Sequence, residues 1–181
     1  MDPYLSLPQD SLEAFLAFSK REEHPKNTVL LKEGQVSRKI FFVKQGILRF
    51  YYYNDEGKDI THWFLFESDF ITEIDSFIKG SESQYYIETL EDCVLHTINY
   101  DDFNKLSNVF PESERLWNHL LSKIVIELGE KIKDLQFRDA QTRYSNLISK
   151  HPDILLRVAL AHVASYLGIT QQSLSRIRRK K

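Results

Sequence analysis

Two glutamines and a group of basic residues near the carboxyl end carry the clearest chemistry in this sequence. A glutamine amide offers a donor and an acceptor side by side, as an adenine edge requires, and an arginine matches the O6 and N7 atoms of guanine. Other basic and hydroxyl side chains bind phosphate without reading sequence. We therefore predict DNA base contacts from Gln171, Gln172 and Arg176, and DNA phosphate contacts from Thr170, Ser173, Arg178, Arg179, Lys180 and Lys181.

These side chains need a rigid support, and residues 160–179 have the pattern of two short helices joined by a tight turn. Ala164 is small enough for two helices to cross closely, and Gly168 can adopt the positive φ of the turn. Thr170 is suited to cap the second helix. The apolar positions between the helices are Val163, Leu167, Ile169, Leu174 and Ile177. The pattern predicts a helix-turn-helix whose second helix presents its first turn to the major groove of double-stranded DNA.

The charge distribution agrees with a polyanion at this end of the chain. The net charge is only −2, but six basic residues and no acidic residue follow Asp153. An acidic body with a basic end indicates that the end contacts nucleic acid, although a solvated basic tail would look the same.

Residues 112–138 contain no proline and have apolar side chains at helical spacing, which predicts one long helix. One stripe alternates steps of four and three residues, as in helices that pair with a partner. A second stripe, Leu116, Leu120 and Ile124, is expected to face the sheet. The alternative is a single broad stripe lying on the same chain. We predict a homodimer whose seam is formed by Leu121, Val125, Leu128, Ile132 and Leu135.

The amino-terminal half has a different texture. Asp10 is a candidate cap, with Glu13 three positions on, for a short helix over residues 10–20. Short β-branched and aromatic runs follow between Thr28 and Tyr100, separated by turn residues, and they favour an antiparallel sandwich or barrel. After the long helix, Asp139 is a candidate cap for a helix over residues 140–149. The class is α+β, with a β sensor domain over 1–110, a dimerisation helix over 111–138 and a DNA-binding domain over 139–181.

The composition indicates the class of protein and the cellular compartment to expect. Hydrophobic residues make up 42% and charged residues 28% of the 181 residues, as in ordinary folded proteins. The single cysteine, Cys93, excludes an intrachain disulfide and suggests a buried thiol. The amino end lacks the basic and apolar segments of a secretion signal, and no apolar run could span a bilayer. We expect a cytoplasmic protein without membrane association.

Two other functions compete with DNA binding. A metal enzyme of the cupin type would need its ligands assembled across strands, from His62, His96, Glu73 and Glu88, because no two of the six histidines lie within two residues of each other. Sequence signatures of nucleophilic hydrolases and phosphate-binding loops are absent. We therefore expect no catalysis, cofactor or metal. The other alternative is a β-sandwich ligand-binding or adaptor protein whose helices bind protein.

The order of β domain, long helix and helix-turn-helix resembles the Crp/Fnr family of regulators over nearly the whole chain. Residues 164–178 are similar to the family's recognition segment, and the glycines at Gly34 and Gly46 match its cyclic nucleotide-binding jelly roll. The resemblance implies that Gln171, Gln172 and Arg176 read bases. It also implies a dimer on a pseudo-palindromic promoter site, with RNA polymerase as a further partner.

The sensor departs from the family's pattern for cyclic AMP. That pattern has a Gly-Glu pair and, about ten residues later, an arginine that grips the phosphate. Here Thr72 replaces the glycine before Glu73, and no arginine occurs in residues 81–85. The lost charge-assisted pair is worth about 2–3 kcal/mol. We therefore do not expect cyclic AMP, and predict a pocket for an unidentified small-molecule effector near Thr72, Glu73, Ser83 and Gln84.

Overall fold

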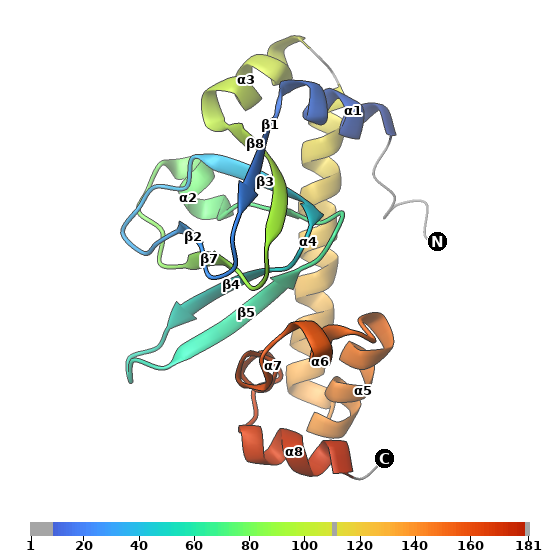
Figure 1. The fold of residues 1–181 in the computed structure, drawn as a ribbon. Helices are drawn as coiled ribbons and strands as arrows, with labels where there is room; N and C mark the ends of the chain where they lie inside the picture. Colours follow the sequence, from blue (N-terminus) through green and yellow to red (C-terminus); the bar gives the residue numbers. More distant parts are fainter. Residues whose placement is uncertain (1–8, 110–111, 180–181) are drawn as a thin grey trace.

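The computed structural model describes residues 9–109 and 112–179. Its larger part is a β domain of two antiparallel sheets with four strands each (Figure 1). The first sheet has the order β1 (Lys20–His24), β8 (Cys93–Asn99), β3 (Lys39–Gln45) and β6 (Phe70–Ile71). The second has the order β2 (Val29–Leu31), β7 (Tyr86–Thr89), β4 (Leu48–Tyr53) and β5 (Asp59–Leu65). The predicted α+β class with an antiparallel jelly roll is confirmed.

The turns explain why these runs stay separate strands. Gly46, between β3 and β4, has a φ of +99°, and a Cβ atom there would lie 2.5 Å from the sulfur of Cys93. Only glycine fits such a position. Cys93 is a free, buried cysteine, and burial raises the pKa of its thiol to about 11, as expected of an inert core residue. Residues of both sheets enclose the core, including Leu31, Phe41, Val43, Leu48, Ile87 and Leu95.

Three helices cover one end of the β domain: α1 (Gln9–Phe18), α3 (Tyr100–Val109) and the first part of α4 (Glu112–Phe137). Leu116 is fully buried and Leu120 is 8% exposed in a core cluster with Ile40 and Ile98. The prediction that this stripe of α4 faces the sheet is confirmed. Asp10 lies in the first turn of α1 and not before the helix, so its predicted capping role is wrong.

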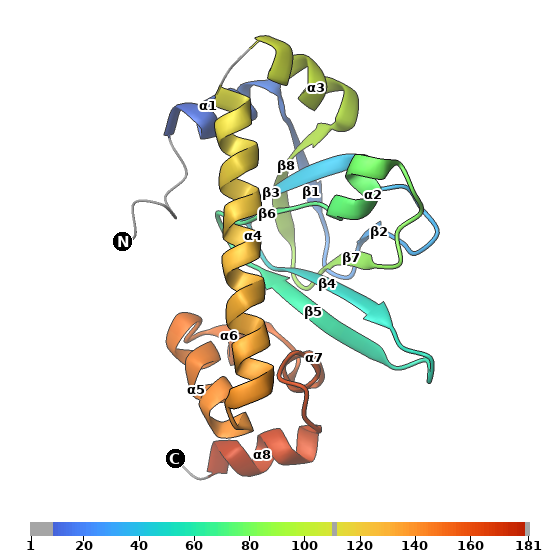
Figure 2. The same cartoon turned by 180° about the vertical axis from the view of Figure 1, so that it is seen from behind.

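The carboxyl-terminal helices gather around the other end of α4 (Figure 2). They are α5 (Ala140–Lys150), α6 (Ile154–Arg157), α7 (Leu160–Tyr166) and α8 (Gln171–Arg179), whereas the short α2 (Ile74–Lys79) belongs to the β domain. The Asp139 carboxylate accepts a 2.8 Å hydrogen bond from the Thr142 N–H, which confirms its predicted cap. Among the described residues, no helix has the length and apolar character needed to cross a bilayer.

Candidate nucleic-acid interface and effector cavity

Helices α7 and α8 pack as the helix-turn-helix pattern requires. Val163 and Leu174 are fully buried, and Ala164 is 2% exposed where the helices approach each other. Gly168 has a φ of +65°, and the Ile169 N–H donates to the Ala164 carbonyl at 3.0 Å across the turn. These residues share a core cluster with Phe64 and other β-domain side chains. Helix α8 is therefore held in a fixed geometry against α7.

The start of α8 is capped from within the motif. The Thr170 hydroxyl accepts a 3.1 Å hydrogen bond from the Ser173 N–H and donates to the Ser173 hydroxyl at 3.0 Å. This confirms Thr170 as the N-cap of α8, which begins at the next residue. The Thr170 hydroxyl donates within this turn, whereas the Ser173 hydroxyl accepts there and keeps its own proton for a phosphate.

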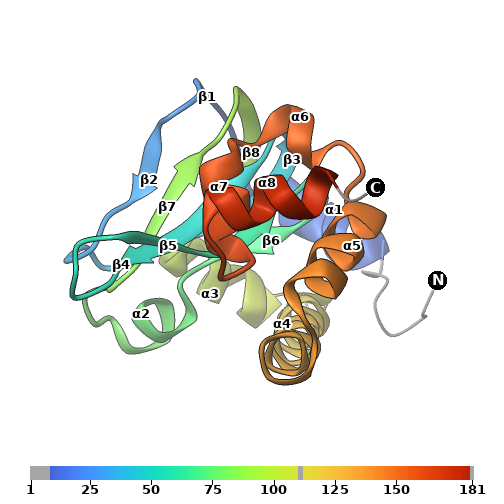
Figure 3. The same ribbon diagram turned by 90° about the horizontal axis from the view of Figure 1, so that it is seen from below.

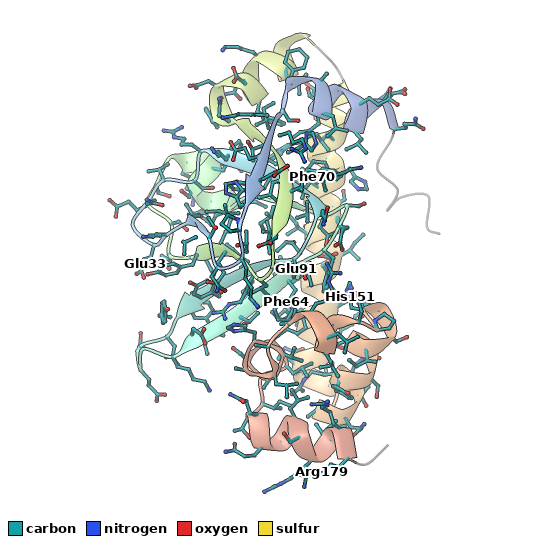
Figure 4. The ribbon with its side chains drawn as sticks, in the orientation of Figure 1. Glu33, Phe64, Phe70, Glu91, His151 and Arg179 are labelled. Carbon is teal, nitrogen blue, oxygen red and sulfur yellow. The ribbon has the colours of Figure 1, made fainter. Side chains whose placement is uncertain are left out.

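The outer face of α8 carries the predicted contact residues. This helix lies at the end of the molecule away from α1 and α3, and Arg179 projects from it (Figures 3 and 4). No residue of α8 is acidic. The predicted residues Lys180 and Lys181 lie outside the described residues. Of the predicted side chains, Ser173 is half-buried and the exposed ones are Thr170, Gln171, Gln172, Arg176, Arg178 and Arg179.

Helix α7 is docked on strand β5 of the β domain. The Ser165 hydroxyl accepts a 2.9 Å hydrogen bond from the Thr61 N–H and donates to the Asp59 carbonyl at 3.2 Å. The rings of Phe64 and Tyr166 lie 5.2 Å apart. A serine side chain thus joins the backbone of β5, so the helix-turn-helix is attached to the β domain by polar as well as apolar contacts.

A buried arginine lies at the same junction and was not singled out from the sequence. Arg49, on β4, is 1% exposed and forms ion pairs with Asp59 and, at 3.4 Å, with Glu88. Its guanidinium also contacts the His162 ring of α7 and lies 3.9 Å from the centre of the Tyr51 ring. Burial lowers the pKa of His162, and the positive charge of Arg49 lowers it further. The only sequence signal is one arginine within an otherwise apolar strand.

A second ionic link joins the domains at α6. Arg157 donates to Glu67 at 2.5 Å and also pairs with Glu91, both carboxylates of the β domain. Arg157 is one of the six basic residues after Asp153 that were expected to face a polyanion. Its charge is instead matched by two carboxylates, so the basic surface begins with Arg176.

The predicted dimer seam is an exposed apolar stripe on α4. Val125 is 67%, Leu128 38%, Ile132 53% and Leu135 55% exposed, and Leu121 is half-buried. Four large apolar side chains in one row on a single helix are unusual in a surface that faces only water. The alternative of one broad stripe packed on the same chain is wrong for Val125 and Ile132, which are mostly exposed.

A cavity of about 770 Å³ lies between the β domain and α4. Its wall is mainly apolar and aromatic, with Phe50, Trp63, Tyr85 and Trp117 among its residues. The seam residues Leu121 and Leu128 also line it. The volume suits a small organic molecule.

The cavity includes only half of the residues predicted for the effector pocket. Thr72 and Glu73 line it, whereas Ser83 and Gln84 do not. The Glu73 carboxylate accepts hydrogen bonds from the N–H groups of Asp75 and Ser76 and so caps α2. The Ser83 hydroxyl accepts a 3.0 Å hydrogen bond from the Tyr85 N–H, and Gln84 is exposed. Local backbone hydrogen bonding therefore accounts for two of the four residues.

The ligands considered for a metal enzyme are not assembled. His96 lies on the first sheet, whereas His62 and Glu88 lie on the second, and Glu73 caps α2. Within the described part of the chain, no three His, Cys, Asp or Glu side chains gather to hold a metal ion.

Comparisons with known proteins identify the family. Residues 21–109 match the family model of the cyclic nucleotide-binding domain. The chain is 22% identical over 177 residues to the cAMP-activated global transcriptional regulator CRP of Salmonella typhimurium, covering 92% of this chain and 84% of that protein. It is 23% identical over 193 residues to the CRP-like protein Clp of Xanthomonas campestris, covering 98% and 84%.

Solved structures show the same fold. The c-di-GMP responsive global regulator CLP of Xanthomonas campestris superposes with a TM-score of 0.77 at 22% identity, over 96% of this chain and 91% of that chain. FixK2 of Bradyrhizobium japonicum gives a TM-score of 0.78 at 15% identity, over 90% and 83%. With the β domain, long helix and terminal helix pair in the same order, the chain belongs to the Crp/Fnr family of transcription regulators.

Proposed function

We propose that this chain binds a pseudo-palindromic promoter site on double-stranded DNA as a homodimer and thereby regulates transcription. The observation that carries the proposal is the outer face of α8. The helix begins at a capped turn and contains no acidic residue, and the side chains of two glutamines and an arginine on this face are exposed to solvent. A helix of this kind fits the major groove.

The exposed stripe on α4 supports the dimer. Pairing two copies of α4 along Val125, Leu128, Ile132 and Leu135 removes these side chains from water. A two-fold axis along the paired helices relates the two copies of α8, so that each reads one half-site. Half-sites about 34 Å apart lie one helical turn apart on the same face of the duplex.

The charges of the large cavity argue against cyclic AMP as effector. The lining has four carboxylates and two lysines, and no arginine of the described residues is among them. Lys79 is paired with Asp75 at 2.5 Å, and Lys123 with Asp69 at 2.5 Å, so neither is free for a phosphate. Glu73 adds a negative charge at the start of α2, where a phosphate would otherwise accept hydrogen bonds. The effector is therefore an uncharged or cationic molecule with a large apolar surface.

The experiment is a selection of duplexes with a randomised central region, followed by fluorescence anisotropy across a salt series. The wild-type chain enriches a site with two inverted half-sites, and its affinity falls steeply with salt because bound counterions are released. Arg176→Ala weakens the selected site by about 1–3 kcal/mol and reduces discrimination at one base position. Arg115→Ala is the control, because it removes an exposed arginine from α4, away from α8.

Association with a protein but no salt-dependent binding to any duplex would refute the proposal and favour an adaptor. Equal losses on selected and random DNA for Arg176→Ala would refute the base-reading role of that residue.

A further inference from the structure

A second cavity, of about 510 Å³, lies where the β domain meets the helices that follow it. Its wall combines Trp63 and Phe64 of β5, residues of α4 and α5, and Tyr166 of α7. It shares Trp63, Asp69, Lys123 and Glu127 with the larger cavity and extends toward the helix-turn-helix. An occupant would contact the sensor, the long helix and the DNA-reading module at once.

The charged groups around this cavity are paired unequally. Each of its four carboxylates lies within 4.0 Å of a basic side chain: Asp69 and Glu127 of Lys123, Asp134 of Arg138, and Glu130 of both Lys133 and Arg138. Among the described residues, no carboxylate lies within 4.0 Å of the remaining basic groups of the wall, which are Lys131, Arg143 and Lys150. Asp69 and Glu127 share one lysine, but the four carboxylates stand against six cations in all, so the surplus charge at this cavity is positive.

Lys131 is half-buried and lies against two aromatic rings. Its ammonium donates to the His62 carbonyl and lies 4.6 Å from the centre of the Trp63 ring and 4.8 Å from that of Tyr166. Two ring faces and one carbonyl stabilise an ammonium without neutralising it. Burial lowers the pKa of Lys131 to about 8, which is the result expected for an amine with no counter-charge.

The other two cations differ in availability. Arg143 uses its guanidinium on backbone carbonyls, donating to Leu167 at 3.0 Å and to Arg138 at 2.7 Å. Lys150 is exposed at the end of α5 and is open to a ligand that enters the cavity. Arg143 therefore fixes the wall, whereas Lys131 and Lys150 face an incoming anion.

We propose that this cavity is a second ligand site, which binds a small organic anion carrying a flat apolar body, with its carboxylate on Lys131. The carboxylate supplies the charge that Lys131 lacks, and a charge-assisted hydrogen bond in an enclosed site is stronger than a cation–π contact. The apolar body rests against Phe64, Phe66 and Leu147. This site goes beyond the DNA-binding function and differs from the larger cavity, whose charges favour an uncharged or cationic ligand.

The test is isothermal titration calorimetry of the full chain with 2-naphthoate and with its uncharged counterpart 2-naphthamide. Wild type binds the naphthoate at least tenfold more tightly than the amide. Lys131→Met keeps a side chain of similar length and removes this preference. Lys133→Met removes an exposed cation two residues away that already has a carboxylate partner, and it binds the naphthoate as wild type does.

A pH series gives a second and independent readout. Wild-type affinity for the naphthoate falls as the pH rises through about 8, because Lys131 loses its proton there. Lys131→Arg keeps its charge to high pH and retains the anion preference without this fall. The proposal is overturned if Lys131→Met binds naphthoate as wild type does, if the amide binds wild type as tightly as the acid, or if wild type binds neither probe. None of these measurements uses DNA, so they stand apart from the test of the proposed function.

Discussion

Replacing Ile132 with alanine tests whether α4 pairs with a second copy of itself. Ile132 is 53% exposed in the single chain. Complete burial of an isoleucine side chain is worth about 1.5–3 kcal/mol, so covering the exposed half is worth about 1–1.5 kcal/mol per chain. Both copies lose this in a symmetric dimer, about 2–3 kcal/mol in all, and the dissociation constant rises roughly 30- to 140-fold.

Sedimentation velocity over a concentration series measures this change. Phe137→Ala is the matched control, because it removes a larger apolar side chain that is 80% exposed on the same helix. Phe137 is two residues beyond Leu135, so it projects from the opposite side of α4. If Phe137→Ala weakened association as much as Ile132→Ala, or if Ile132→Ala had no effect, the seam would be wrongly assigned.

Three further predictions concern DNA affinity, stability and pH. Arg179→Ala weakens binding to all duplexes alike and lowers the salt slope by about one, as anisotropy would show; a loss confined to one sequence would contradict its phosphate role. Gly46→Ala forces a Cβ to within 2.5 Å of Cys93 at a φ of +99°, and costs about 2 kcal/mol or more. Thermal unfolding should show a midpoint lower by about 4–8 °C. Burial lowers the pKa of His62 to about 4, so between pH 6.5 and 4 the unfolded chain binds more protons and stability falls on acidification. His62→Gln should flatten this dependence in denaturant titrations at pH 7 and pH 5.

The helix-turn-helix could be predicted because its requirements are local. Ala164, Gly168 and Thr170 each answer a steric or hydrogen-bonding demand within a few residues, and the structure places all three as expected. The bounds of α4 and the Asp139 cap were predictable for the same reason. Each of these local features depends on residues that lie within about two helical turns of one another.

Features that depend on pairing between distant residues were not predictable. Strand β1 has the sequence Lys-Arg-Glu-Glu-His, which has no apolar alternation, and it forms because β8 supplies its hydrogen bonds. Arg49 contacts His162 across 113 residues of sequence. The cavity around Lys131 likewise requires β5, α4 and α7 to meet. A single sequence does not show which distant residues come into contact in the folded chain.

Leu121 and Leu128 have a double position, since they belong to the proposed seam and also line the large cavity. Dimerisation and effector binding then involve the same two side chains, so the two equilibria are coupled. By reciprocity, a ligand that tightens the pairing of the helices must bind more strongly as the protein becomes more concentrated, by the same factor. The apparent affinity for an effector would therefore depend on the concentration of this protein in the cell as well as on the cavity itself.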